Sequence, residues 1–347
     1  MLTAMEIQDD RKLRVAYYIT GHGTYFPVSG GGIEDASKLS LIYWFHHRTG
    51  FGHSTRAVVI IDRLLQLHHT VTIVTSAPQW IFSDQLTLYP SLCSFRSIST
   101  VDPGVIQSDP VTVDEDKTMQ KLKDFLDGAD EIVECEAEWM REWRPDVVCL
   151  DAAFLPAIVA KKVGVPSVVV SNFSFDAIFH AIARTDPEHH LSQTCQKMYS
   201  ATQYLIRLPG HIHFPFLNPS TAKIVDVPLV VRKVRRSKVD IRTELSISLD
   251  ANCCLITFGG FELVGPGREW TAERVLPEGW YGVIAGPYGE GTAKGRLRWV
   301  PGEKYHLPDL INAVDVVVGK LGYGTCSEVV ALRKPLVYVP RPKFVEE

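Results

Sequence analysis

The stretch RPDVVCLDAAFLPAIVAKKVGVPSVVVSN, residues 144 to 172, decides the fold. It begins with an apolar, β-branched run at Arg144 to Asp151, continues with a helical segment at Pro156 to Gly164, and ends with a second apolar run at Pro166 to Asn172. Strands buried on both faces are continuous apolar runs, and a helix between two of them makes them parallel neighbours. The stretch therefore predicts one β-α-β unit of a doubly wound α/β fold.

The same alternation precedes this stretch. An apolar run at Leu13 to Thr20 predicts the first strand, a helical period at Arg56 to His69 predicts a helix, and Thr70 to Ser76 predicts the next strand. The segment Asp114 to Trp143 is rich in Glu, Lys and Leu and has no proline, which predicts a long helical stretch with a break near Gly128. The first part of the chain is thus one Rossmann-like unit.

A second series follows a change in composition. Between Leu208 and Val227 the periodicity is lost among prolines, so we expect the interdomain region there. The basic run Arg232 to Lys238 is either a solvated face or a phosphate contact. Further strands are then expected at Cys254 to Gly260, Trp280 to Gly286, Asp315 to Lys320 and Pro335 to Pro340. We therefore expect two domains, residues 1–225 and residues 226–347, the second one incomplete.

Composition bounds the class of protein. The chain has 347 residues, 46% hydrophobic and 22% charged, with a net charge of −4. These values are typical of a soluble globular protein and favour a small-molecule partner over nucleic acid. The sequence has no run of 18 apolar residues and no visible signal peptide, so we expect no membrane segment and a cytoplasmic location. The seven cysteines lack a C-x-x-C spacing and are expected to be buried free thiols without a metal.

Four strand ends carry residues suited to chemistry, and the most informative is VVVGKLGYGTCSE. Glycines allow a phosphate to approach the backbone, hydroxyls donate to it, and a helix N-terminus favours its charge. Glu328, on the expected first turn, is suited to accept hydrogen bonds from a ribose. The alternative is an ordinary helix cap made by serine and glutamate. The residues concerned are Gly322, Gly324, Thr325, Ser327 and Glu328.

Two other strand ends are weaker candidates. The pair Gly259 and Gly260 ends the first strand of the second series, where it makes either a tight turn or a phosphate cradle. The stretch SNFSFDAIF places Asn172, Ser174 and Asp176 together after a strand of the first series. Helix capping explains the second stretch equally well.

The fourth strand end is split into two fragments, GHG at Gly21 to Gly23 and GFGHSTR at Gly50 to Arg56. Removal of Thr24 to Gly50 would join them into one glycine-rich loop of ordinary length. We interpret these residues as an insert, with an unremoved intron as its hypothetical source. His22 and His53 then stand in the same loop, and a histidine is suited to take a proton near neutral pH.

Together, YYITGHGFGHSTR with the insert set aside, SNFSFDAIF, LIRLPG with DVPLVVRKVRRSK, and VVVGKLGYGTCSEVVALRKPLVYVPR resemble the N-terminal, glycosyltransferase-like half of L-arabinokinase. The GYGTCSE region is more distantly similar to the bacterial peptidoglycan N-acetylglucosaminyltransferase. The resemblance covers nearly the whole chain apart from the insert. It implies a GT-B architecture of two Rossmann-like domains.

The resemblance also implies site roles. Gly259, Gly260 and the glycines and hydroxyls of the GYGTCS segment would lie near the diphosphate of a nucleotide sugar, and Glu328 would hold its ribose. His22 or His53 would be the general base on the acceptor side, and Asp176 is a further catalytic candidate. The acceptor itself is not identified by the sequence. No metal or other cofactor is expected.

Three departures from the family pattern stand out: the insert lies in the acceptor loop, the chain stops soon after its last expected strand, and the ATP-binding loop of the sugar-kinase half is missing. Besides a glycosyltransferase, they leave open a non-catalytic nucleotide-sugar-binding or regulatory module. A sugar kinase would need a phosphate loop and a magnesium site, and neither is evident. An NAD-dependent enzyme would need G-x-G-x-x-G after the first strand, where the chain has GHGTYF.

Overall fold

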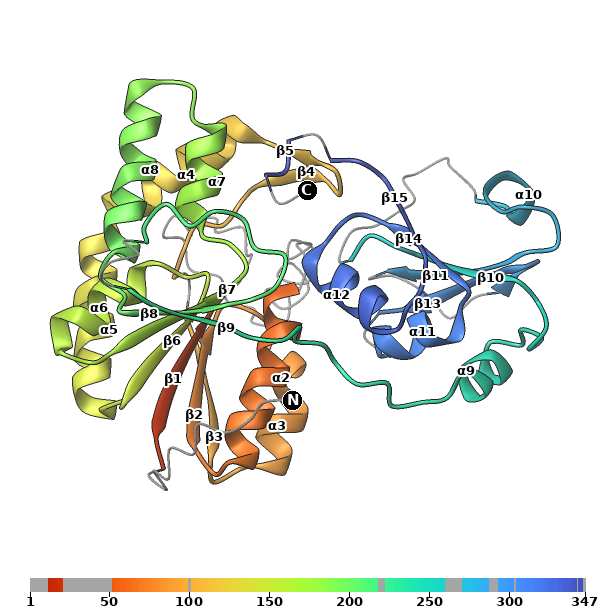
Figure 1. Cartoon of the computed structure of the whole chain (residues 1–347), viewed down its shortest axis with the longest axis horizontal. Helices are drawn as coiled ribbons and strands as arrows, with labels where there is room; N and C mark the ends of the chain where they lie inside the picture. The colour runs from red at the N-terminus through yellow and green to blue at the C-terminus, as the bar shows by residue number, and fades with distance from the viewer. Residues whose placement is uncertain are drawn as a thin grey trace, which may run out of the picture.

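The computed structural model describes residues 12–20, 52–98, 101–217, 222–259, 270–286, 293–302, 304–341 and 343–345. His22, Gly260 and the proposed insert from Thr24 to Gly50 lie outside the described residues. The described chain forms two α/β units, each built on its own sheet (Figure 1). We call them the N-terminal and the C-terminal unit.

The sheet of the N-terminal unit has seven strands among the described residues, and every pair of neighbours is parallel. Their order is β3 (Cys93–Ser97), β2 (Thr70–Thr75), β1 (Arg14–Ile19), β6 (Val147–Asp151), β7 (Ser167–Ser171), β8 (Tyr204–Arg207) and β9 (Lys223–Asp226). The strand order reverses direction between β1 and β6, which is the arrangement of a doubly wound sheet. The predicted β-α-β unit of residues 144 to 172 is present as β6, α6 and β7.

Helices cover both faces of this sheet (Figure 1). One face carries α2 (Gly52–Gln66), the 3₁₀ helix η1 (Gln79–Phe82) and α3 (Ser83–Leu88), and the other carries α4 (Glu115–Asp127), α5 (Ala129–Trp143), α6 (Leu155–Val163), α7 (Phe175–Ile182) and α8 (Asp186–Tyr199). Side chains of β1 alternate between the two faces, so Tyr17 packs with Ile61 of α2 and Tyr18 with Leu155 of α6. This double burial explains the continuous apolar run of the strand.

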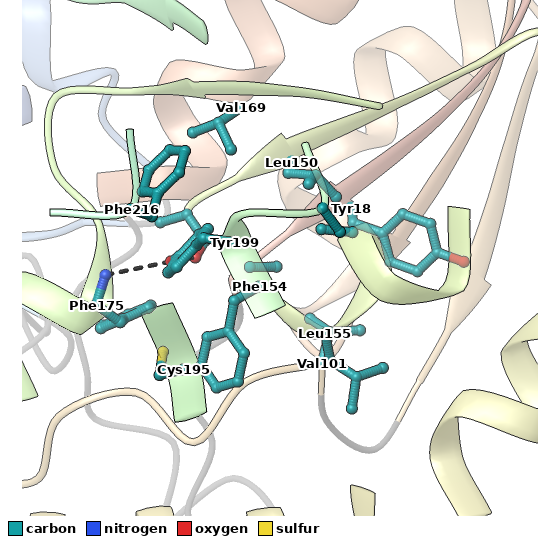
Figure 2. Close-up of a cluster of buried hydrophobic side chains, with 14 of the residues drawn as sticks. Tyr18, Val101, Leu150, Phe154, Leu155, Val169, Phe175, Cys195, Tyr199 and Phe216 are labelled. Carbon is teal, nitrogen blue, oxygen red and sulfur yellow. Dashed lines mark hydrogen bonds between the residues drawn. The ribbon is translucent and has the colours of Figure 1, made fainter. Parts of the chain in front are cut away.

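A buried tyrosine ties together two loops at the carboxyl end of the sheet. Figure 2 shows Tyr199 among Phe154, Phe175 and Phe216 in the larger core cluster. The backbone N–H of Phe175, at the start of α7, donates to the Tyr199 hydroxyl over 3.2 Å, and that hydroxyl donates to the carbonyl of Ala152. The turns after β6 and β7, where the candidate site begins, are therefore held to each other through the core.

The C-terminal unit has a six-stranded sheet among its described residues, in the order β12 (Ala293–Lys294), β13 (Leu297–Pro301), β11 (Tyr281–Gly286), β10 (Cys253–Thr257), β14 (Val316–Gly319) and β15 (Leu336–Tyr338). Only the β12–β13 pair is antiparallel within this described sheet. The helices of this unit are α9 (Lys238–Glu244), α10 (Ala272–Val275), α11 (Leu307–Ala313) and α12 (Tyr323–Ala331). A short hairpin, β4 (Gln107–Asp109) with β5 (Thr112–Val113), belongs to neither sheet.

The structure confirms several local predictions and corrects others. The long helical stretch is indeed broken at Gly128, between α4 and α5. The interdomain region was expected between about Leu208 and Val227, but Lys223–Asp226 at its end pairs with β8 as the edge strand β9 of the first sheet. Its side chains are mostly exposed, so this strand has no apolar run. The chain passes to the second unit after Asp226 and before α9.

Two further features concern the whole described chain. Of the seven cysteines, the buried ones are Cys93, Cys149, Cys195, Cys253 and Cys254. All seven are free thiols, and Cys135 is exposed, so the expectation of buried free thiols is confirmed for most of them. In the part of the chain that the structure describes, no helix is both long enough and apolar enough to span a membrane.

Candidate functional site

The carboxyl ends of the N-terminal sheet face the start of α12 of the C-terminal unit (Figure 1). Three polar side chains lie at this edge: Asp151 ends β6, Asn172 follows β7, and His53 stands in the first turn of α2. The GFGHSTR fragment was expected to precede the helix. Instead α2 begins at Gly52, so His53 is placed by helical backbone rather than by a loop.

His53 and Asp151 form a hydrogen-bonded pair. The Nδ1 of His53 lies 2.9 Å from Oδ1 of Asp151, and the side chains are 12% and 0% exposed. Burial by itself raises the pKa of Asp151, but Arg56 and His53 outweigh it and hold that pKa below its ordinary value. The carboxylate is therefore ionised at neutral pH and suited to accept a hydrogen bond from the Nδ1–H of His53. In that tautomer the proton is on Nδ1 and the ring lone pair is on Nε2.

Arg56 is the third member of this cluster. Its Nη2 donates to Oδ1 of Asp151, its Nε lies 3.4 Å from Oδ2 of the same carboxylate, and its Nη1 donates to Oδ1 of Asn172 over 2.7 Å. The Nη2 atom is also 3.2 Å from Nδ1 of His53. A buried carboxylate thus has a buried guanidinium as its counter-charge, which offsets the cost of removing both ions from water.

The second half of the site is the start of α12. The helix begins at Tyr323, and its N-cap residue Gly322 makes no side-chain capping bond. The sequence suggested that Gly324, Thr325 and Ser327 lie in a loop before the helix. In the structure they lie within the helix. Ser327 donates its hydroxyl to the carbonyl of Tyr323 over 2.7 Å, so it serves its own helix. The first backbone N–H groups of an α-helix have no partner within the helix, and such groups are suited to bind an anion.

At Gly324 the described atoms leave open space beside this helix start. A Cβ added to Gly324 would have no described heavy atom within 4 Å, and residues 322 to 326 are half-buried. Gly259, with φ of +70°, stands at the end of β10. A Cβ at Gly259 would lie 4.0 Å from Cε of Lys320, and one at Gly322 would lie 3.9 Å from the same atom. The Lys320 side chain therefore runs between the two glycines, where it adds a positive charge to the helix start.

Glu328 lies deeper than expected, on the second turn of α12. It is 4% exposed, and its Oε1 accepts a hydrogen bond from Nε of Arg232 over 2.7 Å. Its buried Oε2 has no hydrogen-bond partner among the described residues. Burial raises the pKa of Glu328 and Arg232 lowers it in part, with a net rise. Glu328 does not cap the helix, because it pairs with Arg232 of the preceding basic run.

Asp176 is a buried carboxyl in the first turn of α7. It is 1% exposed, and burial raises its pKa to about 6 even though Ser174 and nearby backbone N–H groups lower it. Ser174 is the N-cap of α7 but makes no side-chain capping bond. No described hydrogen bond joins Asp176 to His53, so a catalytic role of Asp176 stays a prediction.

Sequence reasoning missed four of the charged residues that the structure brings together, namely Arg56, Asp151, Arg232 and Lys320. Asp151 and Lys320 each end an expected strand. A charged residue at the carboxyl end of a parallel strand could have indicated a role in the site. The basic run is either a solvated face or a phosphate contact by sequence. In the structure several of its members are exposed, as a solvated face requires, and Arg235 pairs with Asp84 at the surface. In the described part of the chain, no group of three or more His, Cys, Asp or Glu side chains is placed to hold a metal ion.

A family model described as glycosyl transferase family 1 matches residues 42–217, a span that includes His53, Asp151 and Asn172. The chain belongs to glycosyl transferase family 1. It is 33% identical over 324 residues to an L-arabinokinase of Arabidopsis thaliana, a match that covers 91% of this chain and 30% of the relative. The chain therefore spans about 30% of the length of that curated relative. The resemblance to the glycosyltransferase-like half of L-arabinokinase is confirmed.

Solved structures of glycosyltransferases share the fold. UGT2 of Phytolacca americana, complexed with UDP-2fluoro-glucose and pterostilbene, gives a TM-score of 0.56 at 12% identity, over 94% of this chain and 80% of that one. Arabidopsis thaliana UGT89C1, complexed with quercetin, gives 0.58 at 15% identity over 95% and 79%. SsfS6 of Streptomyces sp. SF2575, complexed with thymidine diphosphate, gives 0.51 at 16% over 96% and 83%. These likenesses confirm the expected GT-B fold of this glycosyl transferase family 1 chain.

Proposed function

We propose that this chain binds a nucleoside-diphosphate sugar at the start of α12 and transfers the sugar to an acceptor hydroxyl held near His53. One observation carries the proposal: a helix start whose N-cap makes no side-chain capping bond, with Lys320 beside it, faces the pair of half-buried His53 and buried Asp151 on the other unit (Figure 1). An anion site and a general base are the two parts that glycosyl transfer needs.

On the donor side, the backbone N–H groups of Tyr323 and Gly324 and the ammonium of Lys320 bind the diphosphate. The unpartnered Oε2 of Glu328 accepts a hydrogen bond from a ribose hydroxyl, while Arg232 keeps the other oxygen occupied. Charge-assisted hydrogen bonds of this kind are about twice as strong as neutral ones. These contacts also stabilise the charge that develops on the leaving diphosphate.

On the acceptor side, Nε2 of His53 takes the proton of the acceptor hydroxyl. The acceptor oxygen forms a bond to the anomeric carbon of the sugar, and the bond from that carbon to the diphosphate oxygen breaks. The nucleoside diphosphate leaves with the electron pair. Asp151 stabilises the imidazolium formed at His53 through the Nδ1 hydrogen bond.

The first test is binding. UDP, GDP and TDP sugars are titrated into the purified chain while its melting temperature is followed, and one of them should raise it. Glu328→Gln should remove that rise, and Glu278→Gln, an exposed glutamate of the same unit, should retain it. A melting temperature that no nucleotide sugar moves contradicts the proposal.

A second candidate function is a module that binds a nucleotide sugar without turnover. One observation favours it: Arg56 already bonds to Asp151, so part of the carboxylate charge is neutralised before any imidazolium forms. Release of nucleoside diphosphate over a panel of donors and acceptors separates the two, because the module binds a donor but releases nothing.

A further inference from the structure

The two halves of the site touch at Arg56 and Tyr323. The Cζ atom of Arg56, on α2 of the N-terminal unit, lies 5.3 Å from the centroid of the Tyr323 ring, on the first residue of α12. Guanidinium groups are attracted to the faces of aromatic rings within about 6 Å. The contact therefore connects Arg56, which is hydrogen-bonded to Asp151, with Tyr323, the first residue of the proposed donor helix α12.

Tyr323 is fixed against the N-terminal unit at a second point. Its hydroxyl donates to the carbonyl of Pro209 over 3.0 Å. Gly210, with φ of +70°, lies directly alongside, since a Cβ built on it would be 4.0 Å from Cε2 of the tyrosine ring. The ring is thus held by the N-terminal unit, while its backbone belongs to the helix start that would bind the donor.

The guanidinium on the other side of this contact has little freedom. Its three nitrogens all face hydrogen-bond acceptors, two of them on Asp151 and one on Asn172, and Arg56 is 6% exposed. A planar fork that is bonded along both of its edges cannot turn without turning the carboxylate with it. The same Oδ1 of Asp151 also faces Nδ1 of His53. The orientation of the Arg56 guanidinium therefore fixes the position of the carboxylate oxygen to which the His53 ring is hydrogen-bonded.

We propose that Arg56 is a positioning residue that couples the first turn of α12 to the orientation of the His53–Asp151 pair. The proposal rests on the proposed function, since the ligand at α12 is the donor diphosphate. A diphosphate on the N-terminal amides changes the position of Tyr323, and Arg56 transmits that change to Asp151. Coupling of this kind needs a contact whose geometry differs between the free and the bound state. In this proposal the contact between the Arg56 guanidinium and the Tyr323 ring has that function.

The coupling is tested on protein with ¹⁵N-labelled histidines. The His53 signals are identified by their absence in His53→Gln, and their ring nitrogen shifts report which nitrogen carries the proton. In the wild-type chain, saturating UDP should shift them. Tyr323→Leu removes the ring and should lose the shift while UDP still binds by calorimetry. Tyr323→Phe keeps the ring, loses only the bond to Pro209, and should retain the shift.

The positioning role is tested separately without ligand. Arg56→Lys keeps the positive charge but loses the planar guanidinium with its several donors. The His53 ring should then become a mixture of tautomers, and the ring nitrogen shifts of the wild-type chain should not be seen. Asn172→Ala frees one edge of the guanidinium and leaves both buried charges in place. It should produce the same mixture in a folded protein even where Arg56→Lys does not fold.

The outcomes distinguish this proposal from the proposed function. If UDP does not bind the wild-type chain, the donor site is wrong, and the ligand-free tautomers still decide the role of Arg56. If UDP binds and Tyr323→Leu keeps the full His53 shift, the coupling is overturned. An unchanged tautomer in a folded Asn172→Ala protein overturns the positioning role.

Discussion

The Nδ1 of His53 and Oδ1 of Asp151 lie 2.9 Å apart although 98 positions separate them in the chain. The pair exists because β1 and β6 are parallel neighbours, which brings the helix after β1 and the end of β6 to the same edge of the sheet. Arg56, one turn after His53 on α2, bonds to the same carboxylate. Stability and proposed catalysis therefore depend on different partners of Asp151.

Removal of the Asp151 carboxylate and removal of the His53 imidazole should have different effects on the free energy of unfolding. Asp151→Ala leaves the buried guanidinium of Arg56 without a counter-charge, and we expect it to lower the free energy of unfolding by about 3 to 5 kcal/mol. His53→Gln loses one hydrogen bond and should cost about 1 kcal/mol. Both changes should abolish transfer. Urea denaturation measures the difference, and equal losses would contradict the assignment of Arg56 as the main partner.

Lys320 should recognise phosphate rather than nucleoside. Lys320→Met removes a charge-assisted hydrogen bond worth about 1.5 to 3 kcal/mol, so UDP should bind roughly tenfold to a hundredfold more weakly. Binding of uridine should be unchanged. Calorimetry with both ligands checks this, with Lys304→Met, an exposed lysine of the same unit, as the control. A parallel loss for uridine would mean that the substitution disturbs the fold around α12.

Two glycines of the C-terminal unit should respond in opposite ways to alanine. A Cβ on Gly319 would lie 2.2 Å from the carbonyl oxygen of Thr257, so Gly319→Ala must separate β14 from β10. We expect a loss of about 1 to 3 kcal/mol, as for other overpacked sites.

Gly324→Ala is the matched change. It meets no described atom within 4 Å and lies in α12, so it should stabilise the fold by up to about 1 kcal/mol. It should still weaken UDP binding, because the methyl group enters the space assigned to the diphosphate. Thermal melts with and without UDP separate the two effects, and unchanged UDP affinity would place the phosphates elsewhere.

The buried carboxyl of Asp176 should make stability depend on pH. Its pKa is raised from 3.8 to about 6 by burial, so the folded state keeps a proton that the unfolded state has already lost. The free energy of unfolding should therefore fall as pH rises through this window, by on the order of 3 kcal/mol from this group. Asp176→Asn should remove that part of the slope.

The control for the pH series is a substitution of a solvent-exposed carboxylate. Asp250→Asn, at an exposed position, should leave the slope between pH 4 and pH 7 unchanged. Denaturation of the three proteins across this range measures the contribution of Asp176. An identical slope in wild type and Asp176→Asn would show that the buried carboxyl does not hold its proton.

Local sequence predicted those elements whose side chains are buried on both faces. The strands β1, β6, β10 and β14 were found because each is a continuous apolar run, and the break at Gly128 because glycine weakens a helix. The edge strand β9 was missed, since an edge strand is held by backbone hydrogen bonds to one neighbour and needs no apolar pattern. Side-chain periodicity carries no signal for it.

What the sequence alone determined is the class of fold, its family resemblance and the general places where chemistry is concentrated, because strand ends and helix starts follow from local periodicity. The packing of the fold brings the charges together in pairs: Asp151 with His53 and Arg56, and Glu328 with Arg232. A buried charge is stable only beside a partner, and partners that come from distant segments are chosen by the packing of the sheet and its helices. That choice leaves no local pattern in the chain.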